Sequence, residues 1–396
     1  MDPVLNPYAP GAGTRPPALA GRDRLRENAR IALARIKAGR AAKSVLLIGL
    51  RGAGKTVLLD RMREDAEAEG YQTMRVEAPE ARSLPALLAP DLRLALIKLS
   101  RKEQAKQLVD RALSGLAGFV GAFKLKYDDI EMGMSYQPEP GLADNGDLEH
   151  DLQALFEVVG EAAQGVGTAL VMFIDELQYV EEDQLAALIT ALHRTAQRQL
   201  PVTLIGAGLP QLPGRMGRAK SYAERLFEFN EIGPLPDEDA AAAIELPAQE
   251  HDVSFDPEAV AEVLRLTQGY PYFLQEWGKH CWDAAERSPI TRSDVEIASE
   301  AALAALDASF FRVRFDRLTP TEKRYLRAMA ALGPGPHRSG DIAQALQREV
   351  QSVAPTRSNL IKKGMLWSPS HGDTAFTVPM FDEYLKRIMP DDSGRP

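Results

Sequence analysis

One eight-residue pattern constrains the fold of this chain more than any other feature. Residues 49–56 read Gly-Leu-Arg-Gly-Ala-Gly-Lys-Thr, which is the pattern G-x-x-x-x-G-K-T. The apolar run 44–48 precedes it and a helix-like segment beginning at Val57 follows it, so it joins a buried strand to a helix. Glycines let successive backbone N–H groups point at phosphate oxygens, and the helix N-terminus adds its positive dipole end. The pattern predicts a phosphate-binding loop; a glycine-rich turn that matches by chance is the alternative.

The residues of this loop have different expected roles. Lys55 is expected to reach the β- and γ-phosphates, and Thr56 to offer its hydroxyl to Mg²⁺. The other expected nucleotide contacts come from the loop backbone and the first helical residues, namely Gly49, Leu50, Arg51, Gly52, Ala53, Gly54 and Val57. The predicted cofactors are therefore ATP and Mg²⁺.

A second motif supports the first. Residues 170–176 form an apolar run that ends in Asp175 and Glu176, as a central parallel strand would. Because open α/β sheets bind ligands at the carboxyl ends of their strands, Asp175 is expected beside the phosphate loop, holding Mg²⁺ through water. Glu176 is expected to deprotonate the attacking water as a general base. The alternative is a core strand with a polar, capping end.

Composition narrows the class of protein. The chain has 396 residues, which favours two or three domains, and its formal net charge of −9 argues against a wholly basic nucleic-acid binder. The single cysteine, Cys281, excludes an intramolecular disulfide and a cysteine-based zinc site. The N-terminus lacks a signal pattern and no apolar run is long enough to span a bilayer, so we expect a cytoplasmic protein without a membrane partner.

Strands alternate with helices as far as residue 235, which predicts an α/β fold: a parallel sheet covered by helices on both faces. This core is expected to span 21–235 and to follow a Pro/Gly-rich arm at 1–20, which either contacts adenine or is passive. An insertion at 100–147 is predicted to hold a helix and a hairpin near 123–134. The apolar face of this helix is expected to carry Leu108, Leu113, Leu116 and Val120. It serves either as surface decoration or as a partner-binding device.

The remainder of the chain changes character. The period is purely helical over 236–306, where we expect an all-α lid. Residues 307–390 are expected to form three helices and a small hairpin, the order of a winged helix-turn-helix. Within 318–389 there are ten Lys and Arg and six Asp and Glu, a local net charge of +4.

This charge favours double-stranded DNA as a partner. The third helix would enter the major groove, and Arg357, Lys362 and Lys363 are the candidate DNA contacts. Winged helices also serve as protein-contact or autoinhibitory modules, which is the alternative.

A cluster of cations near residue 220 suggests a further role. An ATPase that works as an oligomer needs a cation that reaches a neighbour's γ-phosphate. Arg225 and Arg218 are the candidates, and Arg225 is our choice. Such an arginine finger would imply a homo-oligomer; a solvated basic turn is the alternative.

The layout resembles the Orc1/Cdc6-type AAA+ ATPases and the related archaeal and STAND-type P-loop ATPases. The resemblance covers most of the chain and is carried by the following segments: 21–23, 49–56, 173–176, 206–210, 269–271 and 318–389. It implies a Mg²⁺-dependent ATPase that binds ATP and ADP, with Pro271 near the adenine. It also places Arg22 in the segment expected to contact the nucleotide.

Two departures from the family pattern bear on the activity. The strand that ends at Gly206 offers no Asn, Ser or Thr to sense the γ-phosphate, and the helix after Gly269 carries no arginine sensor, with Lys279 a weak substitute. We therefore expect slow hydrolysis and a nucleotide-dependent switch that binds DNA through its winged helix. A nucleotide-gated switch that recruits a protein instead of DNA is the rival hypothesis.

Overall fold

The computed structural model describes residues 1–11, 13–78, 82–100, 105–124 and 136–390. The chain divides into two compact units. The first, here called the sheet unit, comprises residues 23–48 and 55–231. The second, the helical unit, comprises residues 1–22, residues 49–54 and the chain from 232 onward. The glycine loop 49–54 therefore belongs with the helical unit, whereas Lys55 and Thr56 belong with the sheet unit.

The sheet unit is built on five parallel strands in the order β2-β3-β4-β1-β5. The strands are β1 (Ser44–Ile48), β2 (Gln72–Glu77), β3 (Leu170–Asp175), β4 (Val202–Gly208) and β5 (Phe227–Glu231). The predicted parallel sheet is confirmed, and so are its four predicted strands. The edge strand β5 was not predicted, because its sequence Phe-Glu-Phe-Asn-Glu is short and half polar.

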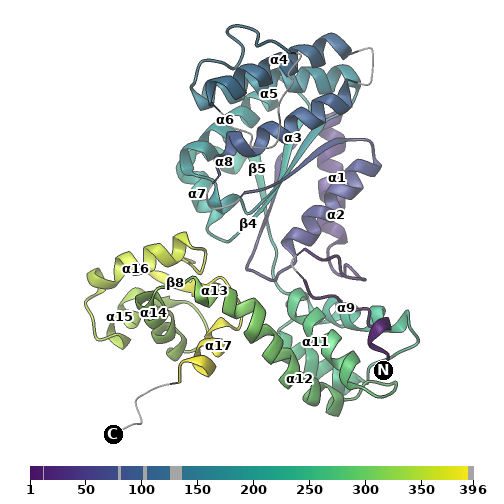
Figure 1. The fold of residues 1–396 in the computed structure, drawn as a ribbon, viewed down its shortest axis with the longest axis vertical. Helices are drawn as coiled ribbons and strands as arrows, with labels where there is room; N and C mark the ends of the chain where they lie inside the picture. Colours follow the sequence, from purple (N-terminus) through teal and green to yellow (C-terminus); the bar gives the residue numbers. More distant parts are fainter. Residues whose placement is uncertain (12, 79–81, 101–104, 125–135, 391–396) are drawn as a thin grey trace. The chain divides into compact units, whose positions relative to one another are not determined.

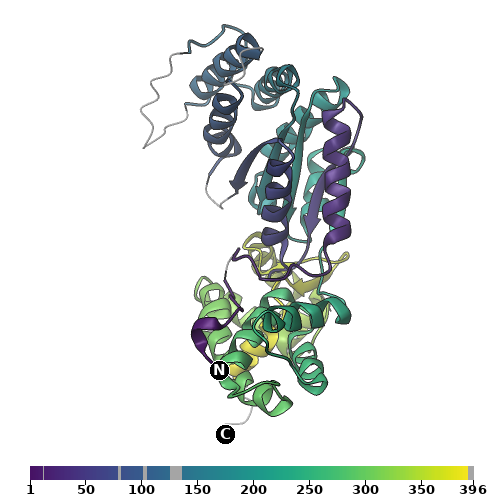
Figure 2. The same ribbon diagram turned by 90° about the vertical axis from the view of Figure 1, so that its right-hand side faces the viewer.

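Helices cover both faces of this sheet (Figures 1 and 2). Helices α1 (Asp23–Lys37) and α2 (Lys55–Ala68) lie on one face, and α5 (Leu148–Val166) and α6 (Glu182–Gln197) lie on the other. Side chains alternate along a strand, so Leu170, Met172 and Ile174 of β3 pack into one core with α5 and α6. All residues of β1, β3 and β4 are buried, as expected for central parallel strands.

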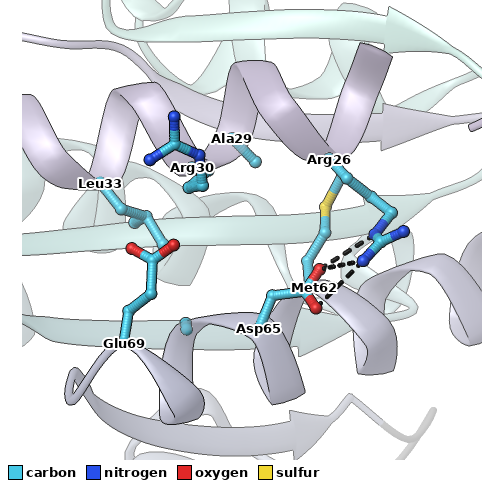
Figure 3. Close-up of a pocket in the computed structure, with 8 residues that line it drawn as sticks. Arg26, Ala29, Arg30, Leu33, Met62, Asp65 and Glu69 are labelled. Carbon is cyan, nitrogen blue, oxygen red and sulfur yellow. Dashed lines mark hydrogen bonds and ion pairs between the residues drawn. The ribbon is translucent and has the colours of Figure 1, made fainter. Parts of the chain in front are cut away.

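An ion pair joins α1 to α2 on the first face. The Arg26 guanidinium donates two hydrogen bonds to the Asp65 carboxylate, Nε–Oδ2 at 2.9 Å and Nη2–Oδ1 at 3.1 Å (Figure 3). These residues line a pocket between the two helices together with Arg30, Met62 and Glu69, among others. No residue of either nucleotide motif lines this pocket, so it is a packing feature of α1 and α2.

The predicted insertion contributes to the core of the sheet unit. Helix α4 (Lys106–Ala122) packs against α3 (Leu84–Leu99) and α5, and its Val109 and Phe119 are fully buried. Of the residues expected on its apolar face, Leu113 and Leu116 are buried and Val120 packs against the core, whereas Leu108 is 37% exposed. Helix α3 continues through Pro90, which lies inside it. The predicted hairpin at 123–134 lies almost wholly outside the described residues.

The lid is one part of the helical unit. The segment expected to be all-α forms the helices α9 (Asp237–Gln249), α10 (Pro257–Thr267), α11 (Pro271–Ala284) and α12 (Arg292–Leu306). The N-terminal arm packs on α11, where the Trp282 indole donates to the Asp2 carbonyl oxygen at 2.9 Å. Tyr8 is 4% exposed, and its hydroxyl donates to the Ile244 carbonyl oxygen. The aromatic ring of the arm therefore lies in the lid core.

The C-terminal part shares this core. It contains α14 (Pro320–Ala331), α15 (Ser339–Ala345), α16 (Val350–Lys362) and α17 (Phe381–Ile388). An antiparallel sheet β6-β8-β7 joins β6 (His337–Arg338), β8 (Asp373–Phe376) and β7 (Leu366–Trp367). A capping box of Thr319 and Glu322 starts α14. The assignment of this part as a winged helix-turn-helix stays a prediction, as do the domain boundaries.

Candidate nucleotide site

The sheet unit brings the side chains of the two motifs together. Thr56 lies in the first turn of α2, and Asp175 is the last residue of β3, 3% exposed. The Thr56 hydroxyl donates to Asp175 Oδ2 at 2.7 Å. Hydroxyl and carboxylate oxygens are the hard ligands that Mg²⁺ prefers, directly or through water. These two residues, 119 positions apart in sequence, therefore fit the predicted metal site.

Arg75 is a cation beside Asp175 that the sequence analysis did not predict. Arg75 on β2 places Nη2 at 3.5 Å from Asp175 Oδ2, while its Nε donates to Asp60 Oδ1 at 2.7 Å. Because β2 and β3 are neighbours in the sheet, a residue of β2 can reach the end of β3. The alternation of β2 gave no sign of this role, since Arg75 looked like a solvent-facing residue. Lys55 is 9% exposed at the start of α2.

Glu176 has an unusual backbone conformation. Its φ of 55° and ψ of 34° lie in the left-handed region, which residues other than glycine seldom adopt. Such conformations persist where the surrounding structure holds them, and they gather at functional sites. The Glu176 carboxylate accepts a hydrogen bond from the Gln178 side chain. The predicted general base therefore has a defined partner two residues downstream.

The glycine loop is described within the helical unit. Gly52 and Gly54 have φ values of +79° and +83°, which explains why glycine is needed at both positions. The Tyr272 amide donates to the Gly52 carbonyl oxygen at 3.2 Å, and the Arg51 amide donates to the Thr377 carbonyl oxygen at 2.9 Å. Pro271, predicted to lie near the adenine, is beside this loop: a Cβ added at Gly54 would lie 3.7 Å from its Cγ.

Arg22 forms a hydrogen bond within the helical unit. Its guanidinium donates to the Gly233 carbonyl oxygen at 2.6 Å. Burial lowers the pKa of this guanidinium, and nearby Asp239 acts in the opposite direction. Within the helical unit, Arg22 therefore joins the N-terminal arm to the chain entering the lid, and its contact with a nucleotide stays a prediction.

The candidate arginine fingers differ in their surroundings. Arg225 is exposed on the short helix α8 (Ala223–Leu226). The Arg218 side chain is 62% exposed on α7 (Leu212–Ala219), with its Nε 3.4 Å from Glu182 Oε2. Arg215 is instead held by the carbonyl oxygens of Gln178 and Val180, and burial lowers the pKa of its guanidinium. A role for Arg225 in a neighbouring subunit stays a prediction.

Two of the three candidate DNA contacts have structural partners. Arg357 on α16 donates to Thr374 Oγ1 at 2.7 Å and to Ser368 Oγ at 2.8 Å, which ties the helix to the hairpin. Lys363 donates to Glu322 Oε2 at 2.8 Å, inside the capping box of α14. Lys362 is exposed. The position of charge in sequence could not separate these roles, since all three residues lie on one short basic segment.

Replacing Lys363 by alanine is expected to lower the free energy of unfolding by about 1–2 kcal/mol. The change removes a charged hydrogen bond from the Glu322 carboxylate, and Glu322 is only 4% exposed. The Lys362→Ala variant is the matched control and should leave stability unchanged within about 0.5 kcal/mol. Chemical denaturation of the two variants measures the difference. Equal stability of both would show that the Lys363–Glu322 contact contributes nothing.

Family models match two parts of the chain. Residues 18–205 match the AAA ATPase domain, and residues 308–385 match a domain of unknown function (DUF8462). No curated protein sequence matches the chain.

Solved structures match nearly the whole chain. A Walker-type ATPase of Pyrococcus abyssi is 16% identical, with 96% of this chain and 99% of that chain covered and a TM-score of 0.58. The RuvB Holliday junction branch migration motor of Thermotoga maritima is 16% identical, with 95% and 99% covered and a TM-score of 0.46. The Orc1 protein of Aeropyrum pernix, solved in complex with DNA, is 18% identical, with 94% of each chain covered and a TM-score of 0.46. The first likeness supports the fold.

Among the described residues, no helix combines the length and the apolar character needed to cross a membrane. The predicted resemblance to AAA+ ATPases is confirmed by the domain match and by the five-stranded parallel sheet that carries the joined motifs. Residues 18–205, which include the glycine loop, the acidic motif and the strand after it, therefore match an AAA ATPase domain.

Proposed function

We propose that the chain hydrolyses Mg²⁺-ATP and acts as a nucleotide-dependent switch that binds double-stranded DNA through residues 307–390. The main support for ATP hydrolysis is the hydrogen bond of 2.7 Å between the Thr56 hydroxyl and the Asp175 carboxylate, with Glu176 next in the chain. A hydroxyl, a carboxylate and a second carboxylate in this order supply a metal site and a base at one edge of the sheet.

Each side chain has a distinct task in this proposal. Bound Mg²⁺ supplies a positive charge to the phosphate oxygens, and Thr56 and Asp175 would hold it. Lys55 neutralises charge on the β- and γ-phosphates from the helix N-terminus. Glu176 orients the attacking water and accepts its proton. Arg225 is the proposed cation supplied to a neighbouring copy, which would make the active form a homo-oligomer.

Phosphate release by the purified full-length chain tests the hydrolytic part. We expect slow turnover of ATP that requires Mg²⁺ and stops when EDTA removes the metal. Turnover that persists unchanged in EDTA, or none at any nucleotide concentration, would contradict this part of the proposal.

The DNA part rests on the local net charge of +4 in 318–389 and on the exposed positions of α16. Exposed Ser358, Asn359 and Lys362 lie on this helix and can face a groove, whereas Arg357 and Lys363 are held by the module itself. Among the three original candidates, Lys362 is therefore the residue whose loss should act on DNA without acting on the fold.

Replacing Lys362 by alanine is expected to weaken binding to duplex DNA several-fold and to reduce the slope of log K against log salt by about 1, as the loss of one phosphate contact would. Fluorescence anisotropy over a salt series measures both quantities. Exposed Lys98 on α3 gives the matched control, since it lies outside the C-terminal part. An identical salt slope in the Lys362 variant would contradict a phosphate contact at this position.

One observation favours the rival function, a switch that recruits a protein. The Arg357 guanidinium donates hydrogen bonds to Thr374 and Ser368, and the Lys363 ammonium donates to Glu322. Fewer cations in this part of the chain are therefore available to bind DNA phosphates. If duplex DNA neither binds nor alters turnover, capture of a partner by the ATP-bound protein becomes the appropriate assay.

A further inference from the structure

The end of strand β4 carries glycines whose missing side chains would press on neighbouring leucines. A Cβ added at Gly206 would lie 2.4 Å from Leu177 Cδ1 and 2.8 Å from Leu46 Cδ2. A Cβ added at Gly208 would lie 2.7 Å from Leu212 Cδ2 and 3.0 Å from Gln178 Oε1. An Asn, Ser or Thr at either position would have to displace the ends of these leucine side chains, and in this sequence the polar group nearest the end of β4 comes from another element.

Gln178 supplies such a group. It lies in the short 3-10 turn η3 (Leu177–Tyr179) that follows Glu176, and it is 3% exposed. Its Oε1 accepts a hydrogen bond from the Leu209 amide at 3.0 Å, directly after β4. Its Nε2 donates to Glu176 Oε2. A single buried carboxamide therefore connects the predicted general base to the end of β4.

The orientation of this carboxamide follows from its neighbours. A backbone N–H can be satisfied only by an acceptor, so the oxygen of Gln178 must face Leu209. The nitrogen then faces the Glu176 carboxylate, which accepts hydrogen bonds when it is ionised. The backbone is fixed as well, because the Arg215 guanidinium donates to the carbonyl oxygens of Gln178 and Val180.

We propose that Gln178 is a positioning residue for hydrolysis: it takes the place of the polar residue that β4 lacks and holds the Glu176 carboxylate toward the attacking water. This inference rests on the proposed ATPase activity.

Replacing Gln178 by glutamate isolates the donated hydrogen bond. The glutamate oxygen still accepts from the Leu209 amide, but it cannot donate to Glu176 when ionised, and two adjacent carboxylates repel each other. We expect kcat to fall about 10- to 100-fold, as for a misplaced catalytic group, with the KM for ATP within about threefold of wild type. The acid limb of the pH–rate profile should move to higher pH, because the added carboxylate raises the pKa of the pair.

Two further variants make the test specific. Gln184→Glu is the matched control, since Gln184 Oε1 also accepts from a backbone amide, that of Leu84 at 2.6 Å, but lies on α6. It should keep wild-type turnover and the wild-type pH profile. Gln178→Met keeps the length of the side chain and removes both hydrogen bonds, and it should also lower kcat while a fluorescent ATP analogue still binds.

The outcomes separate this inference from the proposed function. No turnover by the wild-type protein counts against the ATPase proposal itself. Wild-type turnover, with Gln178→Glu within threefold of it and an unshifted pH profile, overturns the role of Gln178 alone. Loss of ATP binding in both Gln178 variants, or failure of both to fold, assigns Gln178 a structural role and equally overturns the inference.

Discussion

Replacing Glu176 by glutamine is expected to lower ATP turnover by about 10²- to 10⁴-fold while ATP still binds, because the change removes the proton acceptor and keeps the shape of the side chain. The neighbouring Asp175 keeps its hydrogen bond from Thr56, so the proposed metal ligands are untouched. Steady-state phosphate release and equilibrium binding of a fluorescent ATP analogue measure the two effects separately.

The matched control is Glu181→Gln, which makes the same chemical change at an exposed position five residues downstream. It should leave both turnover and binding at wild-type values. Turnover by the Glu176 variant within tenfold of wild type would show that another group accepts the proton, and it would remove Glu176 from the mechanism.

Replacing Lys55 by alanine is expected to abolish ATP binding, with the dissociation constant rising about 100-fold or more. The Lys55 side chain, 9% exposed at the start of α2, is the proposed cation for two phosphates, and each charged hydrogen bond contributes roughly 1.5–3 kcal/mol. Titration of the fluorescent analogue measures the loss.

Lys98→Ala serves as the control for a lost positive charge, since Lys98 is exposed in the last turn of α3. Thermal unfolding should give similar midpoints for both variants in the absence of nucleotide. ATP binding by the Lys55 variant at wild-type affinity would contradict the assignment of residues 49–56 as the phosphate-binding loop.

The central strands and the lid were predictable because their physical signals are local. Strand β3 is apolar on both faces and ends in two acids, and α12 and α14 begin with capping boxes that can be recognised in the sequence. The edge strand β5 lacks such a signal, since half-polar edges look like loops. The helical period correctly placed Leu113 and Leu116 of α4 in the core, but at the start of this helix Val109 is fully buried rather than Leu108.

Only those residues of the candidate site that belong to a sequence motif could be predicted. The pairing of Thr56 with Asp175 follows from the topology of a parallel sheet, in which strand ends meet at one edge. The contacts of Arg75 and Gln178 depend on which side chains share a small buried space, and spacing in sequence carries no information about that. The same limit applies to Arg357 and Lys363, whose partners lie on other elements.

The most direct test of the switch is ATP turnover by the purified full-length protein, measured with and without duplex DNA, with Glu176→Gln as the control. We predict slow Mg²⁺-dependent turnover that DNA stimulates and that the control lacks. Turnover that duplex DNA leaves unchanged, at concentrations where binding would be saturated, would contradict the coupling of the ATPase domain to DNA.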